Sequence, residues 1–179
     1  MSDAYQNCED LGRKNFVQVL ENNPKIKTFK FSEKKCEYYD CEVIDANDNK
    51  IYIELKHRAK LSSKDKCIVE EGVMLEKMKL DNLKSFKDGR HLYVYLLNDA
   101  IGYIFDLDKI DFSQLPITKK WCPKNGVDHS KGYVMKDCYM LLPKLACKTI
   151  QIPNYIESEY WKNHLKQLQK QTYVNYKER

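Results

Sequence analysis

The stretch IYIELKHRA, residues 51–59, places an acidic and a basic side chain inside a segment that otherwise resembles a buried strand. Successive side chains of a strand point to opposite faces, so Glu54 and Lys56 share one face. The apolar side chains of Ile51, Ile53 and Leu55 share the other face. One face of this strand is therefore expected to present a carboxylate and an amine two positions apart.

A second acidic residue is expected opposite Glu54. The segment DANDN, residues 45–49, is rich in turn-forming Asp and Asn and lies between two strand-like segments, which predicts a β-hairpin. A loop centred on Asn47 pairs Asp40 with Glu54, because positions symmetric about the centre oppose each other. A register shift of two residues preserves the face and would bring in Glu42, which therefore stays an alternative.

Two adjacent carboxylates repel each other, and fold stability alone does not favour placing them together. A divalent cation removes this objection, since Mg²⁺ prefers oxygen ligands and is commonly held by one or two carboxylates and a substrate phosphate. Mn²⁺ is expected to substitute. The Lys56 amine could orient or help deprotonate an attacking water and neutralise charge developing at phosphorus. The pattern thus predicts a phosphodiester-cleaving site in which Asp40 and Glu54 hold Mg²⁺.

The plainer interpretation is an exposed edge strand with an ordinary charge pair, worth well under about 1 kcal/mol. His57 is expected on the face opposite Lys56, in a structural role, and the other histidines show no metal-binding spacing. The sequence contains no glycine-rich phosphate loop, GxSxG or HExxH motif, which argues against the commonest nucleotide-binding and hydrolase classes.

The elements around these residues follow the order αβββαββ. Periodicity and turn signals predict helices over 8–21 and 70–86, and strands over 25–32, on both sides of the 45–49 turn, and over 91–98 and 101–107. Beyond Leu115 the pattern weakens. Residues 116–132 are expected to form a loop, residues 133–142 a strand, and residues 157–171 a closing helix. No linker indicates a second domain, so residues 1–179 are expected to form one domain.

The Asp40 and Glu54-Leu55-Lys56 pattern, on a hairpin with a helix before and after it, resembles the PD-(D/E)XK nucleases of the restriction-endonuclease-like superfamily. This superfamily includes Holliday-junction resolvases and small phage and bacterial nucleases. The resemblance covers about residues 8–107. It implies an α/β fold, a restriction-endonuclease-like αβββαβ core with a central mixed sheet flanked by helices. Residues 108–179 would then be a basic C-terminal extension ending in a helix. The proline of the family's nominal motif is absent, since Tyr39 precedes Asp40.

The resemblance further implies Mg²⁺-dependent hydrolysis of nucleic acid, with DNA as the expected substrate and a homodimer as one expected state. Asp40, Glu54 and Lys56 would be the catalytic residues. Glu9 matches an accessory acidic residue of the first helix better than Glu21 does.

The second predicted helix contributes two lysines that could reach the site. Lys79 is preferred over Lys77 because Glu76, Lys79 and Leu83 fall at helical spacing. Solvated helix lysines are the other interpretation.

Charge and cysteine content limit the expected partners and the expected cellular compartment. Residues 111–179 hold 12 Lys and Arg against 6 Asp and Glu, which is compatible with a phosphate-backbone partner. The seven cysteines form no CxxC pair, and no secretion signal or membrane span is visible. We therefore expect a cytoplasmic, intracellular protein with reduced thiols. The resemblance to small nucleases implies a phage or bacterial type. The alternative function is a noncatalytic protein that binds nucleic acid or protein with the same fold.

Overall fold

A six-stranded mixed sheet forms the centre of the computed structural model, which describes residues 2–33, 38–125 and 128–158. Its strand order is β1-β2-β3-β5-β6-β9. Neighbouring strands are antiparallel except β3 and β5, which are parallel. The strands are β1 (Ile26–Phe31), β2 (Cys41–Asp45), β3 (Lys50–Arg58), β5 (Gly89–Leu97), β6 (Ile101–Asp106) and β9 (Lys148–Gln151).

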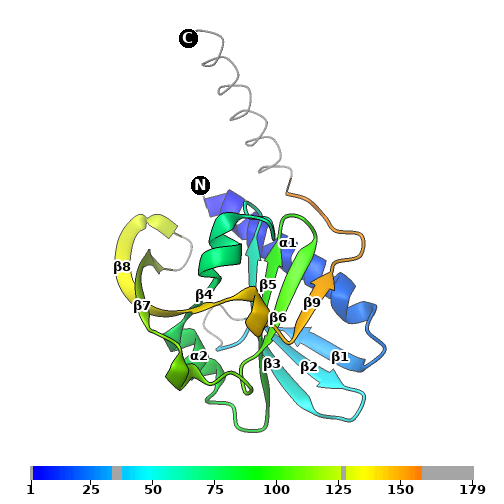
Figure 1. Cartoon of the computed structure of the whole chain (residues 1–179). Helices are drawn as coiled ribbons and strands as arrows, with labels where there is room; N and C mark the ends of the chain where they lie inside the picture. The colour runs from blue at the N-terminus through cyan, green and yellow to red at the C-terminus, as the bar shows by residue number, and fades with distance from the viewer. Residues whose placement is uncertain (1, 34–37, 126–127, 159–179) are drawn as a thin grey trace.

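Helix α1 (Ser2–Glu21) covers one face of this sheet (Figure 1). Its Phe16 and Leu20 pack against buried side chains of β2 and β3, among them Val43 and Ile53. The helix ends at Glu21, before the Asn-Asn-Pro segment that predicts its termination. The predicted first helix is therefore confirmed, and its apolar stripe covers the core on this face of the sheet.

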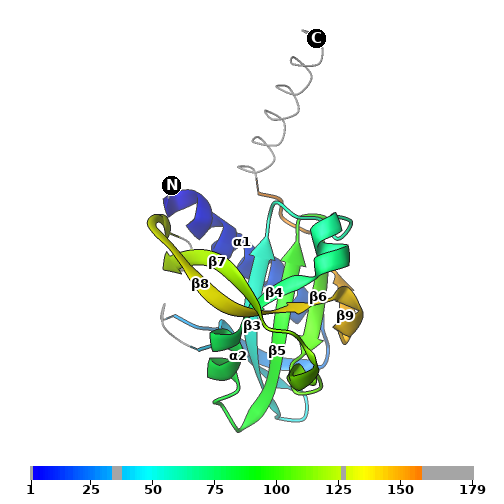
Figure 2. The ribbon, with the colours of Figure 1, turned by 60° about the vertical axis from the view of Figure 1, so that its left-hand side comes forward.

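A second, three-stranded sheet covers the opposite face, in the order β4-β8-β7 (Figure 2). Between the two sheets lies a core of aromatic and aliphatic side chains that includes Tyr93, Phe105, Leu75 and Leu141. Helix α2 also packs on this side. The elements are β4 (Val73–Glu76), α2 (Lys77–Leu83), β7 (Thr118–Asn125) and β8 (Asp128–Leu141), with a π-helical turn Cys67–Glu71 and 3₁₀ turns Phe112–Gln114 and Pro143–Leu145.

The predicted hairpin and its register are confirmed. Val43 pairs with Ile51 and Cys41 with Ile53, so the turn is centred on Asn47. The Asp45 side chain accepts hydrogen bonds from the backbone N–H groups of Asn47 and Asn49, which is the local chemistry that makes Asp a turn residue. The order helix, three strands, helix, strand is as predicted except that strand β4 precedes the second helix.

Two sequence predictions are wrong. The helix predicted over 70–86 is helical only over Lys77–Leu83, and Val73–Glu76 is strand β4. Val73 and Leu75 point inward at the two-residue period of a strand. The segment is a strand because it pairs with β8, which lies more than sixty positions further along the chain. Residues 116–132, predicted as a loop, contain β7, which likewise gains its backbone partners from β8.

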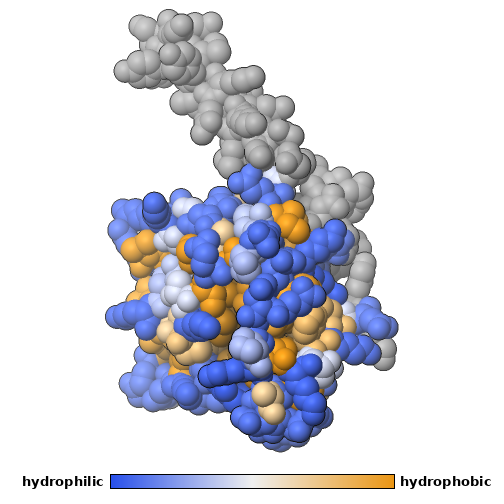
Figure 3. Space-filling model, turned by 90° about the vertical axis from the view of Figure 1, so that its right-hand side faces the viewer, coloured by the Kyte–Doolittle hydropathy of each residue, from blue (hydrophilic) through white to orange (hydrophobic). Residues whose placement is uncertain are grey.

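The segment 108–179 is joined to the core by its strands. β9 extends the main sheet at β6, and β8 pairs with β4. The predicted C-terminal helix lies, from residue 159 on, outside the described residues. Within the described part of the chain, no helix is long and apolar enough to cross a membrane. The face shown in Figure 3 carries hydrophilic side chains around smaller apolar patches.

Candidate active site

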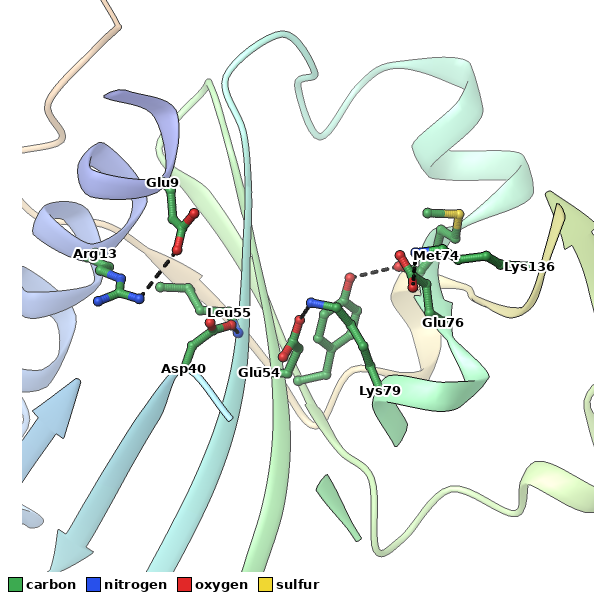
Figure 4. A network of polar contacts seen from close by, with 10 residues as sticks. Glu9, Arg13, Asp40, Glu54, Leu55, Met74, Glu76, Lys79 and Lys136 are labelled. Carbon is green, nitrogen blue, oxygen red and sulfur yellow. Dashed lines mark hydrogen bonds and ion pairs between the residues drawn. The ribbon is translucent and has the colours of Figure 1, made fainter. Parts of the chain in front are cut away.

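Asp40 lies directly before β2, beside the part of β3 that carries Glu54. The two strands pair in register from Ile44–Lys50 to Cys41–Ile53. The Asp40 N–H donates to the Ile53 carbonyl at 2.8 Å, and the Asp40 carboxylate accepts the Leu55 N–H at 2.8 Å. The carboxylate of Asp40 is therefore held at β3, beside Glu54 (Figure 4).

The geometry follows from the unequal lengths of the two strands. β3 continues to Arg58, whereas β2 begins at Cys41. Beyond this point the side chain of Asp40, rather than a backbone carbonyl, satisfies the Leu55 N–H. A backbone N–H without a partner in the sheet needs another hydrogen-bond acceptor, and a charged carboxylate forms the strongest such bond. The end of β2 thus orients the first carboxylate.

Glu54 is buried, with 6% of its surface exposed, and its carboxylate forms an ion pair with the Lys79 ammonium. Burial raises the pKa of Glu54 to about 7, and the negative charge of Asp40 adds to this, while the positive charge of Lys79 opposes it. Burial by itself lowers the pKa of Lys79, but the charges of Glu54 and Asp40 outweigh it and raise that pKa. Glu54 is therefore a carboxylate that needs a neighbouring cation to stay ionised near neutral pH.

Lys56 lies on the same face of β3, two residues beyond Glu54. Burial lowers the pKa of the Lys56 ammonium to about 8, and the positive charges of Arg58 and Lys79 add to this effect. Glu54 and Glu76 oppose the shift. At pH 7 about a tenth of the Lys56 side chains are then neutral amines, which can accept a proton.

The structure adds a pair of residues that sequence reasoning missed, Glu76 of β4 and Lys136 of β8. Their side chains form an ion pair of 2.8 Å and are 14% and 19% exposed. The charge of Glu76 raises the pKa of both Lys56 and Lys79, which places it in the electrostatic environment of the site. Tyr93 connects β5 to β4 in this region, since its hydroxyl donates to the Met74 carbonyl at 2.8 Å. The inward alternation of Val73–Glu76 is the sequence signal that could have revealed β4.

Helix α2 brings Lys79 to the site, as the sequence analysis expected. Its neighbour Lys77 instead pairs with Asp81 on an exposed part of the same helix, at 2.6 Å. The positions of the two lysines are therefore distinct, and it is Lys79 that contacts Glu54.

The two accessory acidic residues form other contacts. Glu42 pairs with Tyr52 in the hairpin register, two positions nearer the turn than Asp40, so it does not take the place of Asp40 beside Glu54. Glu9 forms an ion pair of 3.3 Å with Arg13 on α1. Arg13 also donates to the Ser32 carbonyl at 3.0 Å. Glu9 is therefore engaged on the α1 side, apart from Glu54 (Figure 4).

The histidines with described side chains have structural partners. His57 lies on the α1 face of β3, where a Cβ on Gly12 would come within 2.7 Å of the His57 Cβ, and its ring contacts the Tyr155 hydroxyl at 3.2 Å. His91 contacts the Asp108 carboxylate at 2.8 Å and the Phe86 carbonyl at 2.7 Å. The side chain of His129 and all of His164 lie outside the described residues.

The donor set suits a hard cation. Among the described residues, no group of three or more His, Cys, Asp or Glu side chains converges as a metal cluster would. The Asp40 and Glu54 pair offers oxygen atoms alone, which is the chemistry that Mg²⁺ accepts with one or two carboxylates and several waters. The residues present therefore fit Mg²⁺ or Mn²⁺ better than Zn²⁺, which prefers His and Cys ligands.

No protein-family model matches this sequence, and no curated protein is significantly similar to it. Among solved structures, the chain is similar to Hjc, a Holliday junction resolvase from the archaeal hyperthermophile Archaeoglobus fulgidus. The TM-score is 0.47 at 9% sequence identity, and the match covers 78% of this chain and 95% of that chain. The case for a function stands on the geometry of the site itself.

Proposed function

We propose that this protein is a metal-dependent nuclease that hydrolyses phosphodiester bonds of nucleic acid, with DNA as the expected substrate. The observation that carries the proposal is the Asp40 carboxylate, held by the Leu55 N–H, whose charge acts on the buried Glu54, with Lys56 on the same face of β3 as Glu54. Fold stability gives no reason to place two carboxylates close together beside a partly buried lysine. A shared cation and a reaction that uses the lysine supply that reason.

Asp40 and Glu54 would hold the cation, with Mg²⁺ as the expected ion and Mn²⁺ as a substitute. When bound, it would supply positive charge against the phosphate oxygens and favour the ionisation of water. Glu54 supports this assignment because its buried carboxylate has a pKa raised to about 7, so that a second positive charge nearby would be favourable. The Asp40 carboxylate is already oriented by the Leu55 N–H.

Lys56 would act as the proton acceptor. With its pKa lowered to about 8, the neutral amine can take a proton from an attacking water whose oxygen forms the new bond to phosphorus. One P–O ester bond breaks, and the leaving alkoxide takes a proton from solvent. The protonated Lys56 then stabilises the negative charge that remains on the phosphate product.

Lys79 would neutralise Glu54 and present charge to the substrate. Its side chain is 40% exposed, whereas that of Glu54 is 8% exposed, so Lys79 reaches the site from the solvent side. A lysine in this position can contact a phosphate oxygen while it still balances the buried carboxylate. The basic composition of residues 111–179 is consistent with further contacts to the phosphate backbone.

The test is cleavage of a supercoiled plasmid and of labelled oligonucleotides in the presence of Mg²⁺. The wild-type protein should cleave, and Glu54→Gln should reduce the rate by at least about a hundredfold. Glu42→Gln, two positions nearer the turn than Asp40, is the matched control and should retain activity. Full activity of Glu54→Gln, or inactivity of the wild type with both Mg²⁺ and Mn²⁺, would reject the assignment.

A noncatalytic binding protein is the second candidate, favoured by one observation. Both carboxylates already have partners in the protein, Asp40 the Leu55 N–H and Glu54 the Lys79 ammonium, as in a purely structural cluster. Calorimetric titration of Mn²⁺ into the wild type and Asp40→Asn separates the two. A nuclease site predicts metal uptake that depends on Asp40, and a binding protein predicts none.

A further inference from the structure

Strands β7 and β8 continue beyond the body of the protein as a two-stranded ribbon, here called the ribbon (residues 118–125 and 128–137). β8 pairs with β4 only as far as Cys138, opposite Glu76. From Asp137 outward its described backbone partner is β7 alone. Both ribbon views show this part extending past the edge of the main sheet (Figures 1 and 2).

One face of the ribbon carries large apolar side chains exposed to solvent. Trp121 pairs with Met135, and Pro123 pairs with Tyr133, so these four share a face. Trp121 is 67% exposed, Tyr133 51% and Met135 44%. The residue between Trp121 and Pro123 is Cys122, which is buried on the other face. A tryptophan this exposed contributes little to the core and is typical of a binding surface.

The charge of the ribbon selects the class of partner. The segment 118–141 contains five lysines against two aspartates. Lys119 and Lys120 pair with Asp137 and Glu71 at 3.1 and 3.7 Å, and the exposed members of such pairs readily exchange for phosphate. Two copies of the ribbon packed face to face would bring these like charges together. A polyanion is therefore a better partner than a second copy of this basic chain.

The ribbon begins at the candidate active site. Lys136, the residue next to Met135, forms the ion pair with Glu76, whose charge acts on Lys56 and Lys79. Met135 directly precedes Lys136 along β8, but the side chains of adjacent strand residues point to opposite faces, so Trp121 and Met135 lie on the ribbon face opposite Lys136.

We propose that the ribbon face formed by Trp121, Pro123, Tyr133 and Met135 binds unpaired bases of a nucleic-acid strand by stacking. Any effect of this binding on cleavage rests on the proposed nuclease function, whereas the binding itself does not depend on that function. Duplex bases present only their edges, whereas unpaired bases present the flat faces on which an indole ring stacks. The preferred substrates are therefore nucleic acids with single-stranded segments.

The first experiment measures binding without divalent cations, so that cleavage cannot occur. Fluorescence anisotropy is recorded with a labelled oligothymidine strand and with a labelled blunt duplex. Trp121→Ala should weaken binding of the single strand about tenfold and that of the duplex less than about twofold. Trp121→Phe should recover most of the affinity. Val69→Ala, which removes another exposed apolar side chain, is the control and should change neither affinity.

The second experiment detects stacking directly. The chain has two tryptophans, so Trp161→Phe leaves Trp121 as the only indole fluorophore. Oligothymidine should quench its emission, whereas heparin, a polyanion without bases, should bind without quenching. Absence of quenching by oligothymidine, or an equal loss of single-strand and duplex binding in Trp121→Ala, would overturn the proposal.

Sedimentation velocity tests whether the ribbon instead contacts a second copy of the chain. If Trp121→Ala converts a dimer to a monomer while oligothymidine affinity is unchanged, the ribbon is a contact between copies and the proposal fails. The outcome for the nuclease function is independent of these results. If Trp121 stacks on bases but no metal-dependent cleavage is found, the nuclease function is rejected and the ribbon proposal stands. If cleavage is found but substitution of Trp121 does not change binding, the ribbon proposal is rejected and the nuclease function stands.

Discussion

Lys79 of α2 forms an ion pair with the buried carboxylate of Glu54 on β3, at the point where Asp40 faces the same strand. A helix lysine thus supplies the charge that offsets the proximity of two carboxylates. The same contact ties α2 to the main sheet. Its removal is expected to affect stability as well as the site.

Lys79→Met leaves Glu54 buried without its counter-charge, so its pKa should rise above about 7. At a pH of about 8 the free energy of unfolding should fall by about 1–2 kcal/mol, less than for a fully buried pair because Lys79 is partly exposed. At a pH of about 5 the loss should be smaller, since Glu54 then carries a proton. Urea unfolding at both pH values measures this, with Lys77→Met as the control. An equal loss at both would contradict the electrostatic explanation.

Asp40→Asn separates the structural from the metal-binding role of Asp40. The asparagine side chain can still accept the Leu55 N–H, so thermal stability without metal should change little, whereas Asp40→Ala should lose about 1 kcal/mol. Mg²⁺ or Mn²⁺ should raise the melting temperature of the wild type but not of Asp40→Asn. Thermal scans with EDTA and with each cation test this. A similar metal-induced increase in both proteins would remove Asp40 from the metal site.

The stability of the metal-free protein should depend on pH through Glu54. Its folded-state pKa of about 7 lies above the ordinary value of 4.5, so the unfolded state releases its proton first as the pH rises. This group therefore stabilises the folded protein fully below about pH 4.5 and loses up to about 3 kcal/mol as the pH passes 7. Glu54→Gln should flatten this part of the profile. Urea unfolding in EDTA across this range checks it, and an unchanged slope in the variant would be evidence against a raised pKa.

The rate of cleavage should report the pKa of Lys56. If the neutral amine accepts the proton, single-turnover rates should rise with pH and level off above about 8. Lys56→Arg, which stays charged, should be slower by at least about a hundredfold and should keep its affinity for DNA. Lys77→Arg is the control on an exposed lysine. A pH-independent rate in the wild type would exclude Lys56 as the base.

Glu76→Gln provides a separate check, because the charge of Glu76 raises the pKa of Lys56. The variant should therefore move the rising limb of the pH–rate profile to lower pH. A role of Glu76 confined to folding predicts a lower stability and an unmoved profile. The comparison of the profile with urea unfolding distinguishes the two.

Local patterns were sufficient for the first part of the chain. The stripe that includes Phe16 and Leu20 predicts α1, and the DANDN turn predicts the hairpin and its register. These succeeded because a helix and a hairpin make their backbone hydrogen bonds between residues close in sequence. Lys79 could be selected in advance from helical spacing, although the extent of its helix was predicted too long.

Packing between distant segments was needed to identify β4 and the contacts of Glu76. Val73–Glu76 is a strand because β8 supplies its backbone partners, and Glu76 enters the site's environment only through that pairing. The burial that lowers the pKa of Lys56 and raises that of Glu54 also comes from elements distant in sequence. The sequence by itself thus determined which side chains could carry the chemistry and on which face of β3 they lie. The electrostatic environment was decided by packing, because desolvation depends on what covers a residue and not on its neighbours in the chain.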